Sequence, residues 1–216
     1  MSDRKVFCIG FQRTGTGSLN DALNLLGIRS KHNAQPLFRD LGHPMLRDYD
    51  GFSDNPMPLL YPQLDALFPG SKFILTRRPV ERWLASVEWL FTKGRIKNEW
   101  HRKPIVDEIH RSLYGVTHFE REVFRARYLR HEDEVRAYFR DRPADLLVID
   151  LGVGEPWAAL CSFLDRPVPD RPFPHANRQS SWWRWWPRLV RRRALRWLRG
   201  TAAGTRTSNE MSERGK

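Results

Sequence analysis

The chain has 216 residues and a formal net charge of +12, and its length suits one domain with a sizeable core. No stretch approaches about 18 uninterrupted apolar residues, which argues against a membrane-spanning helix. The apolar run after Lys5 is too short for a secretory signal peptide. Cys8 and Cys161 lie in apolar segments and are expected to be free thiols. These features favour a cytoplasmic protein without disulfide bonds.

The positive charge is concentrated near the end of the sequence. Residues 178–216 hold eleven Lys or Arg and two Glu, which is +9 of the total +12. The preceding region is therefore only mildly basic. We expect a catalytic-type domain over residues 1–178, a helical tail rich in Trp and Arg over 179–200, and a disordered segment over 201–216.

The first predicted elements are a strand, a glycine-rich turn and a helix within residues 6–20. Residues 6–11 form an almost unbroken apolar run, as expected of a parallel strand that is buried on both faces. The helix continues to Leu26 and ends at Gly27. A helix N-terminus offers unpaired N–H groups and a positive dipole end, which suit a phosphate or sulfate. Taken alone, this turn also fits an ordinary strand–turn–helix without a ligand.

The later segments predict alternating helices and strands. Residues 28–33 are expected to form a short strand or a loop that enters the site. The further expected elements are helical pieces over 34–49, a turn-rich stretch over 50–58, a helix over 59–68, a strand over 72–76, a helix from Pro79, amphipathic helices over 95–140 with Leu129 in the core, a strand over 146–151 and a helix from Glu155. This order predicts a three-layer α/β/α fold with a central parallel sheet. Its ligands should bind at the carboxyl ends of the strands.

The glycine-rich loop departs from the common nucleotide-binding loop. Gly10 and Gly15 have the spacing of G-x-x-x-x-G-K-[ST], but Thr16 stands where the lysine is required. The only cation in the loop is Arg13. The segment Arg13-Thr14-Gly15-Thr16 resembles the loop of the sulfotransferase family, which binds the 5′-phosphosulfate of 3′-phosphoadenosine 5′-phosphosulfate. The resemblance implies a fold like that of the P-loop nucleoside triphosphate hydrolases.

A second segment, Arg78 to Ser86, follows the predicted strand 72–76. Sulfotransferases hold the 3′-phosphate of the cofactor with an Arg and a Ser separated by eight positions in the same context, and Arg78 and Ser86 have this spacing. Arg77 is nine positions from Ser86 and so misses this spacing by one residue. The alternative is a solvated arginine pair with a small helix residue.

Further similarity lies in the last part of the predicted domain. Strand 146–151, Trp157, Phe163-Leu164 and the segment 173–177 resemble a motif of bacterial sulfotransferase relatives. The whole resemblance spans residues 5 to about 178. Arg178 is the nearest candidate for a late basic cofactor loop, although the Arg-Lys-Gly version found in the family is absent.

The resemblance implies transfer of a sulfuryl group from the phosphosulfate to a hydroxyl or amine of an acceptor that the sequence does not identify. Arg13 would stabilise the charge on the bridging and sulfuryl oxygens. No metal is required for this chemistry. The 5′-phosphate would be held by the loop and the first turn of the helix, through Arg13, Thr14, Gly15, Thr16, Gly17 and Ser18.

A general base should help to remove the acceptor proton. Asp54 lies in an Asp-x-Pro turn, and His32 follows the first helix. Asp54 is slightly favoured because the turn fixes its side chain, but both residues remain candidates. Asp54 could instead cap the next helix, and His32 could be a surface residue. His131 and His175 are expected to be structural.

Two other functions remain open from the sequence. One is a kinase-like nucleotide enzyme, and the other is a non-catalytic module that acts through its basic tail. Residues 182–199 carry five of the nine tryptophans and seven arginines. An amphipathic helix of this composition suits an anionic membrane surface, and packing of the tryptophans on the domain is an equal alternative. Nucleic-acid binding ranks third, and the oligomeric state is undetermined.

Overall fold

The computed structural model describes residues 4–94 and 103–175. Their core is a five-stranded sheet in the order β2-β3-β1-β4-β5, in which all neighbouring strands are parallel. The strands are β1 (Val6–Cys8), β2 (Ser30–His32), β3 (Gly51–Ser53), β4 (Lys72–Arg77) and β5 (Leu146–Asp150). The predicted central parallel sheet is confirmed.

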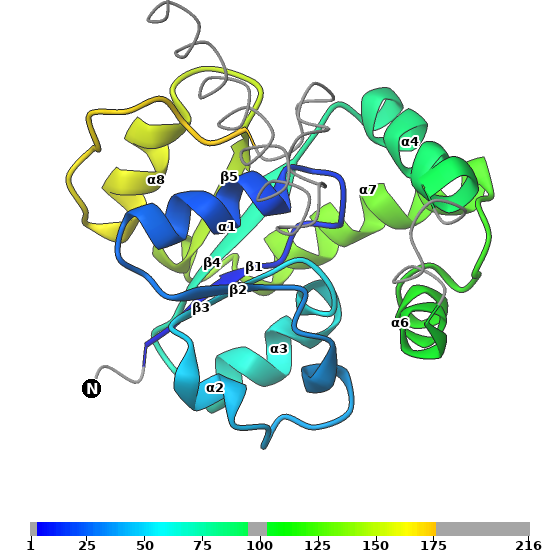
Figure 1. Ribbon diagram of the computed structural model, residues 1–216, viewed down its shortest axis with the longest axis horizontal. Helices are drawn as coiled ribbons and strands as arrows, with labels where there is room; N and C mark the ends of the chain where they lie inside the picture. Colours follow the sequence, from blue (N-terminus) through cyan, green and yellow to red (C-terminus); the bar gives the residue numbers. More distant parts are fainter. Residues whose placement is uncertain (1–3, 95–102, 176–216) are drawn as a thin grey trace, which may run out of the picture. The chain divides into compact units, whose positions relative to one another are not determined.

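Helices cover both faces of the sheet (Figure 1). Alternate residues of β1 point to opposite faces: Cys8 packs among residues of α1 (Thr16–Leu25) and α8 (Pro156–Leu164). Phe7 packs on the other side, against α3 (Met57–Leu67) and the end of α7 (Arg121–Tyr138). The apolar run of β1 is therefore explained by burial on both faces.

A third apolar cluster lies beside the loop that follows β1. Phe11 and Trp83 are its centre, and it joins α4 (Val80–Trp89), α6 (Pro104–Tyr114) and the first half of α7. The remaining short elements are η1 (Gln35–Phe38), α2 (Met45–Asp48), the π-helical turn η2 (Leu90–Gly94) and η4 (Pro143–Asp145). This cluster packs α7 and α4 against the glycine-rich loop.

Two expectations from the sequence are wrong. No strand was expected in the turn-rich stretch over residues 50–58, but residues 51–53 form β3. Phe52 is fully buried there, and β3 pairs with strands on both sides. Leu129, expected in the core, is 47% exposed on α7. The apolar periodicity of residues 95–140 does not continue through one helix, because Gly115 ends α6 in a left-handed conformation. Helix α7 then begins with a buried face of its own, and Leu129 lies outside that face.

Residues 28–33, for which a strand or a loop was expected, contain edge strand β2. Arg178 and the tail over residues 179–216 lie outside the described residues, so the predictions for them stay predictions. Within residues 4–94 and 103–175, no helix is both long and apolar enough to cross a membrane.

We predict that Gly10→Ala will destabilise the fold by about 1–3 kcal/mol, because overpacking a dense site costs this much. A Cβ at Gly10 would lie 2.5 Å from the Thr76 carbonyl oxygen of β4. The control is Gly42→Ala, where a Cβ would meet only the Asp40 side chain and the change should stay within about 0.5 kcal/mol. Urea unfolding measures both variants, and equal losses would contradict the close approach of β1 and β4.

Candidate active site

The candidate site lies where the strands end. Because all the strands are parallel, their carboxyl ends share one edge of the sheet, which is where such folds bind ligands. The glycine-rich loop follows β1, Asp54 follows β3, and Arg78 follows β4. His32 is the last residue of β2. The strand order thus brings together predicted site residues that lie far apart in the sequence, such as Arg13 and Arg78, which are 65 positions apart.

The backbone of the loop is shaped for an anion. Arg13 and Gly15 have left-handed φ values of 72° and 103°, and such turns form concave arrays of N–H groups. Leu19 N–H donates to the Gly15 carbonyl as α1 begins. The preceding N–H groups of α1, which include those of Gly17 and Ser18, have no carbonyl four residues earlier within the helix.

The two loop threonines use their hydroxyl groups inside the protein. Thr14 donates its hydroxyl to the Phe11 carbonyl at 2.6 Å and contacts the hydroxyl of Thr76 at 2.6 Å. Thr16 donates its hydroxyl to Asp54 Oδ2 at 3.1 Å. A hydroxyl has one hydrogen, so in this arrangement neither threonine has a side-chain donor left for a phosphate. The hydroxyl groups brace the loop, and an anion would contact it through backbone N–H groups.

Arg13, Arg78 and Ser86 meet in one cluster. Arg13 Nε donates to Ser86 Oγ at 2.9 Å, and Arg78 Nη1 donates to the Arg13 carbonyl at 3.3 Å. The Arg13 guanidinium also lies 5.7 Å from the centre of the half-exposed Trp89 ring. Burial, and then the charge of Arg78, lower the pKa of Arg13. Among the described residues, no carboxylate forms an ion pair with either arginine, so the cluster keeps positive charge for an anion.

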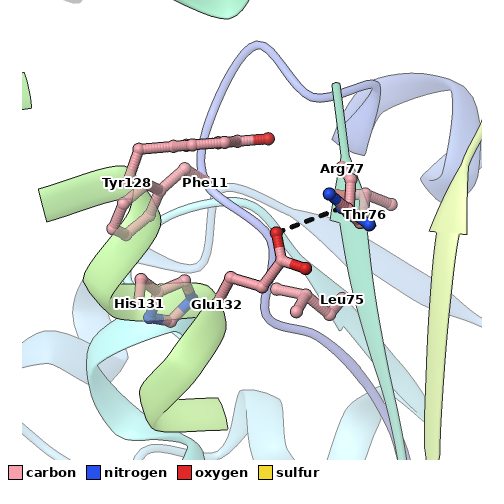
Figure 2. Close-up of a pocket in the computed structure, with 7 residues that line it drawn as sticks. All are labelled: Phe11, Leu75, Thr76, Arg77, Tyr128, His131 and Glu132. Atoms are coloured by element: carbon pink, nitrogen blue, oxygen red, sulfur yellow. Dashed lines mark ion pairs between the residues drawn. The ribbon is translucent and has the colours of Figure 1, made fainter. Parts of the chain in front are cut away.

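The neighbouring arginine is placed differently. Arg77 Nε pairs with the Glu132 carboxylate of α7 at 3.1 Å (Figure 2). Glu132, which also pairs with Arg136, ties Arg77 to α7 at the last residue of β4, and Arg78 is the one that reaches the loop. The structure therefore distinguishes two arginines that are adjacent in the sequence.

The two candidate bases contact each other. His32 Nε2 lies 3.2 Å from Asp54 Oδ2, and its Nδ1 lies 2.9 Å from Ser53 Oγ. Asp54 has a φ of 68° and also accepts the backbone N–H of Asn55 at 2.7 Å. The His32 side chain is 33% exposed and that of Asp54 is 12% exposed. A histidine oriented by a buried carboxylate is an arrangement that can take up a proton.

Several contacts near the site were missed in the sequence analysis. Gln12 contacts His110 of α6 at 3.2 Å and accepts from the Asn55 side chain at 3.3 Å, while its carbonyl accepts from Trp83 Nε1. These partners are 43 to 98 positions away in the sequence, and no local pattern links them. They fix the loop from two sides.

His131 and His175, the two histidines expected to be structural, differ in their burial. His131 is buried, as a structural role requires, whereas His175 is exposed.

A cavity of about 10 Å³, enough for a single water, lies beneath the loop and is too small for a nucleotide. Its walls are Phe11, Leu75, Thr76, Arg77, Tyr128, His131 and Glu132 (Figure 2). In the described part of the chain, no group of three or more His, Cys, Asp or Glu residues could hold a metal ion.

Comparison with known proteins identifies the family of the chain. The profile of the family described as "Sulfotransferase domain" matches residues 5–44 and 31–182, and the chain belongs to this family. Its fold is accordingly P-loop-like, and its family is one of transferases that generally use 3′-phosphoadenosine 5′-phosphosulfate. The chain is also similar to "Ava biosynthesis cluster protein M" of Aspergillus versicolor. The two are 26% identical over 235 residues, which covers 88% of this chain and 90% of that protein.

We predict that inorganic pyrophosphate will stabilise the protein against heat and that Arg78→Ala will bind it about 10- to 150-fold more weakly. This range corresponds to the loss of one hydrogen bond to a charged group. The matched control is Arg77→Ala, because the Arg77 side chain pairs with Glu132 of α7 instead of reaching the loop. Thermal shifts measured over a pyrophosphate titration give both affinities. Equal weakening in the two variants would show that the anion does not distinguish the arginines.

Proposed function

We propose that the protein transfers a sulfuryl group from 3′-phosphoadenosine 5′-phosphosulfate to a hydroxyl or amine acceptor. One observation carries the proposal: Arg13 and Arg78 converge at the N-terminus of α1 without a carboxylate partner among the described residues. In a chain of the sulfotransferase family, this charge has an anionic substrate as its simplest explanation.

The described residues fit a ligand with more than one anionic group. The N-terminus of α1 and the left-handed turns at Arg13 and Gly15 offer N–H groups to a phosphate. Arg78 adds a planar guanidinium that can bind a phosphate through two donors. When bound, the phosphosulfate supplies the activated sulfuryl group. The protein contributes positioning and charge, which dominate transfer of such anionic groups.

Ser86 has two roles in this proposal. Its oxygen accepts from Arg13 Nε, which leaves the hydroxyl hydrogen available to an anion because a serine hydroxyl has one donor and two lone pairs. The residue can therefore orient Arg13 and still contact the 3′-phosphate. Trp89 confines the other side of the Arg13 guanidinium, so Arg13 enters the reaction already oriented toward the site.

Asp54 and His32 act as one unit in taking the acceptor proton. The ionised carboxylate can only accept hydrogen bonds, so His32 Nε2 carries the hydrogen that faces it. Asp54 also receives the Thr16 hydroxyl, which ties this pair to the loop that holds the donor substrate. The proton of the acceptor hydroxyl moves to His32 Nδ1, the ring nitrogen that keeps a lone pair and lies 2.9 Å from Ser53 Oγ. The Asp54 carboxylate then stabilises the positive charge of the imidazolium.

We predict that the protein will bind adenosine 3′,5′-bisphosphate without magnesium more tightly than ATP with magnesium. The reason is the loop, which lacks the lysine of nucleotide triphosphatases and carries Arg13 instead. Isothermal titration calorimetry gives the dissociation constants of both ligands. Equal or tighter binding of magnesium ATP would overturn the proposal in favour of a kinase-like enzyme.

A sulfuryl-transfer assay, run beside the same bisphosphate titration, separates the two arginines. Arg13→Ala should reduce transfer far more than it reduces bisphosphate affinity, because the bisphosphate lacks the sulfuryl group on which Arg13 acts. Arg78→Ala should mainly weaken bisphosphate binding. The same pattern of losses in both variants would contradict this division of roles.

We predict that Asp54→Asn and His32→Gln will each lower turnover by about 10²–10⁴-fold, the usual range for loss of a general base. Residues that act as a unit give non-additive losses, so the double variant should be no slower than the slower single variant. Turnover with the best acceptor from a screen, and bisphosphate affinity as a check on binding, are the measurements.

The control for this pair is another histidine beside a carboxylate. His118 lies 2.7 Å from Glu120, but its side chain is 72% exposed. His118→Gln should leave turnover within about twofold of the wild type, as expected for a surface substitution away from the site. If the Asp54 and His32 losses multiply in the double variant, the two residues act independently.

A further inference from the structure

One face of α7 contacts the ends of both β1 and β4. Tyr128, His131 and Glu132 are spaced at i, i+3 and i+4 and therefore share that face. Figure 2 shows the three side chains leaving the helix toward Phe11 and the end of β4. Each makes a polar contact with a residue next to the candidate site. From the sequence, His131 was expected to be structural, and Tyr128 and Glu132 had no assigned role.

Tyr128 forms two hydrogen bonds with one residue. Its hydroxyl accepts from the backbone N–H of Arg78 and donates to the Arg78 carbonyl, both at 2.9 Å. The last pair of the β4–β5 ladder is Arg77 with Asp150, so Arg78 lies one residue beyond the sheet. The sheet no longer fixes its backbone there, and the hydroxyl of Tyr128 takes over this function.

The tyrosine ring is itself held in place. Its centre is 4.3 Å from the Trp83 ring, with which it stacks, and only 7% of the residue is exposed. Burial raises the pKa of Tyr128, so the phenol keeps its proton and can donate and accept together. A rotated tyrosine would lose the stacking and both hydrogen bonds at once.

The helix is anchored at two further points beside Tyr128. His131 Nε2 lies 2.8 Å from the Ile9 carbonyl, immediately before the loop, and its ring stacks on Phe11 with centres 4.4 Å apart. Burial lowers the pKa of His131 to about 4, so the neutral ring donates Nε2–H to this carbonyl. Glu132 holds Arg77 by the ion pair at 3.1 Å. The position of the Tyr128 hydroxyl is therefore defined relative to both strands.

We propose that Tyr128 is a positioning residue: by bonding both backbone groups of Arg78, its hydroxyl fixes the direction in which the Arg78 side chain leaves the backbone just after β4. The Arg78 guanidinium then reaches the Arg13 carbonyl and stays beside the loop. The inference rests on the proposed function to the extent that Arg78 binds a phosphate of the donor substrate. Tyr128 touches no reacting group and acts through Arg78.

The first test is Tyr128→Phe, which keeps the stacked ring and removes only the hydroxyl. Bisphosphate affinity should fall about three- to tenfold, the effect of one ordinary hydrogen bond. The KM for the phosphosulfate should rise by a similar factor, while kcat changes less than about twofold, because positioning of a binding group affects binding. An unchanged affinity and KM would overturn the proposal.

Tyr138→Phe is the matched control on the same helix. Its hydroxyl donates to Asp65 at 2.8 Å, away from the candidate site. Both substitutions can lower the melting temperature, but only Tyr128→Phe should change bisphosphate affinity. If Tyr138→Phe weakens binding equally, the effect is general destabilisation of α7 and not positioning.

A double-mutant cycle tests whether Tyr128 acts through Arg78. In the Arg78→Ala background, Tyr128→Phe should reduce bisphosphate affinity by less than about twofold, because coupled residues give non-additive effects. The full three- to tenfold loss in that background would mean that Tyr128 acts by another route and would overturn the proposal.

Hydrogen exchange of the Arg78 amide decides the positioning claim without any ligand. Tyr128→Phe should speed this exchange at least about tenfold, whereas Tyr138→Phe should leave it unchanged, since the amide loses its acceptor only in the first variant. Unchanged exchange in Tyr128→Phe overturns the inference. A wild type that fails to bind the bisphosphate, with exchange behaving as expected, would refute the proposed function and leave the positioning of Arg78 established.

Discussion

The close packing of β1 against β4 at Gly10 and Thr76 fixes the position of the candidate site. With no side chain at Gly10, the loop after β1 approaches the Thr76 backbone, and the hydroxyl of Thr76 contacts Thr14 at 2.6 Å. The start of the loop thereby lies against the strand that ends just before Arg78. A wider spacing would separate Arg13 from Arg78, and the two positive charges would no longer serve one ligand.

Charge in this region is distributed unevenly, and the pattern is informative. Arg77 forms an ion pair with Glu132, whereas Arg13 and Arg78 have no carboxylate partner among the described residues. Holding a partly buried guanidinium near a second one costs stability, and the lowered pKa of Arg13 reflects that cost. Proteins keep such arrangements at functional sites, where a ligand supplies the missing opposite charge. Membership of the sulfotransferase family supports the proposal that this ligand is the phosphosulfate donor.

Polar groups around the loop are mostly used to hold it. Thr14, Thr16 and Gln12 each bond to a different neighbour, and His131 bonds the carbonyl of Ile9. Buried polar groups of this kind specify one arrangement when they are paired. The loop therefore needs little rearrangement to present its N–H groups, and preorganisation is how such sites stabilise developing charge.

The sequence by itself determined the local features of this protein. Apolar runs and helical periods predicted β1, β4, β5 and the helices that follow them, and the spacing of Gly10, Arg13 and Gly15 indicated an anion loop. These features depend on neighbouring residues, whose period and turn chemistry are readable in one dimension. Strand β3 was not predicted from the sequence, because its three residues are held in an extended conformation by pairing with β1 and β2 on either side.

Only the tertiary structure decided which side chains meet. The parallel pairing of β2 with β3 sets His32 beside Ser53, and so joins the two candidate bases that the sequence presented as alternatives. The same holds for Ser86 with Arg13 and for Tyr128 with Arg78, which are 73 and 50 positions apart. Such contacts follow from strand order and helix packing, and the energy that fixes them is spread over the whole core. No local segment of the sequence contains that information.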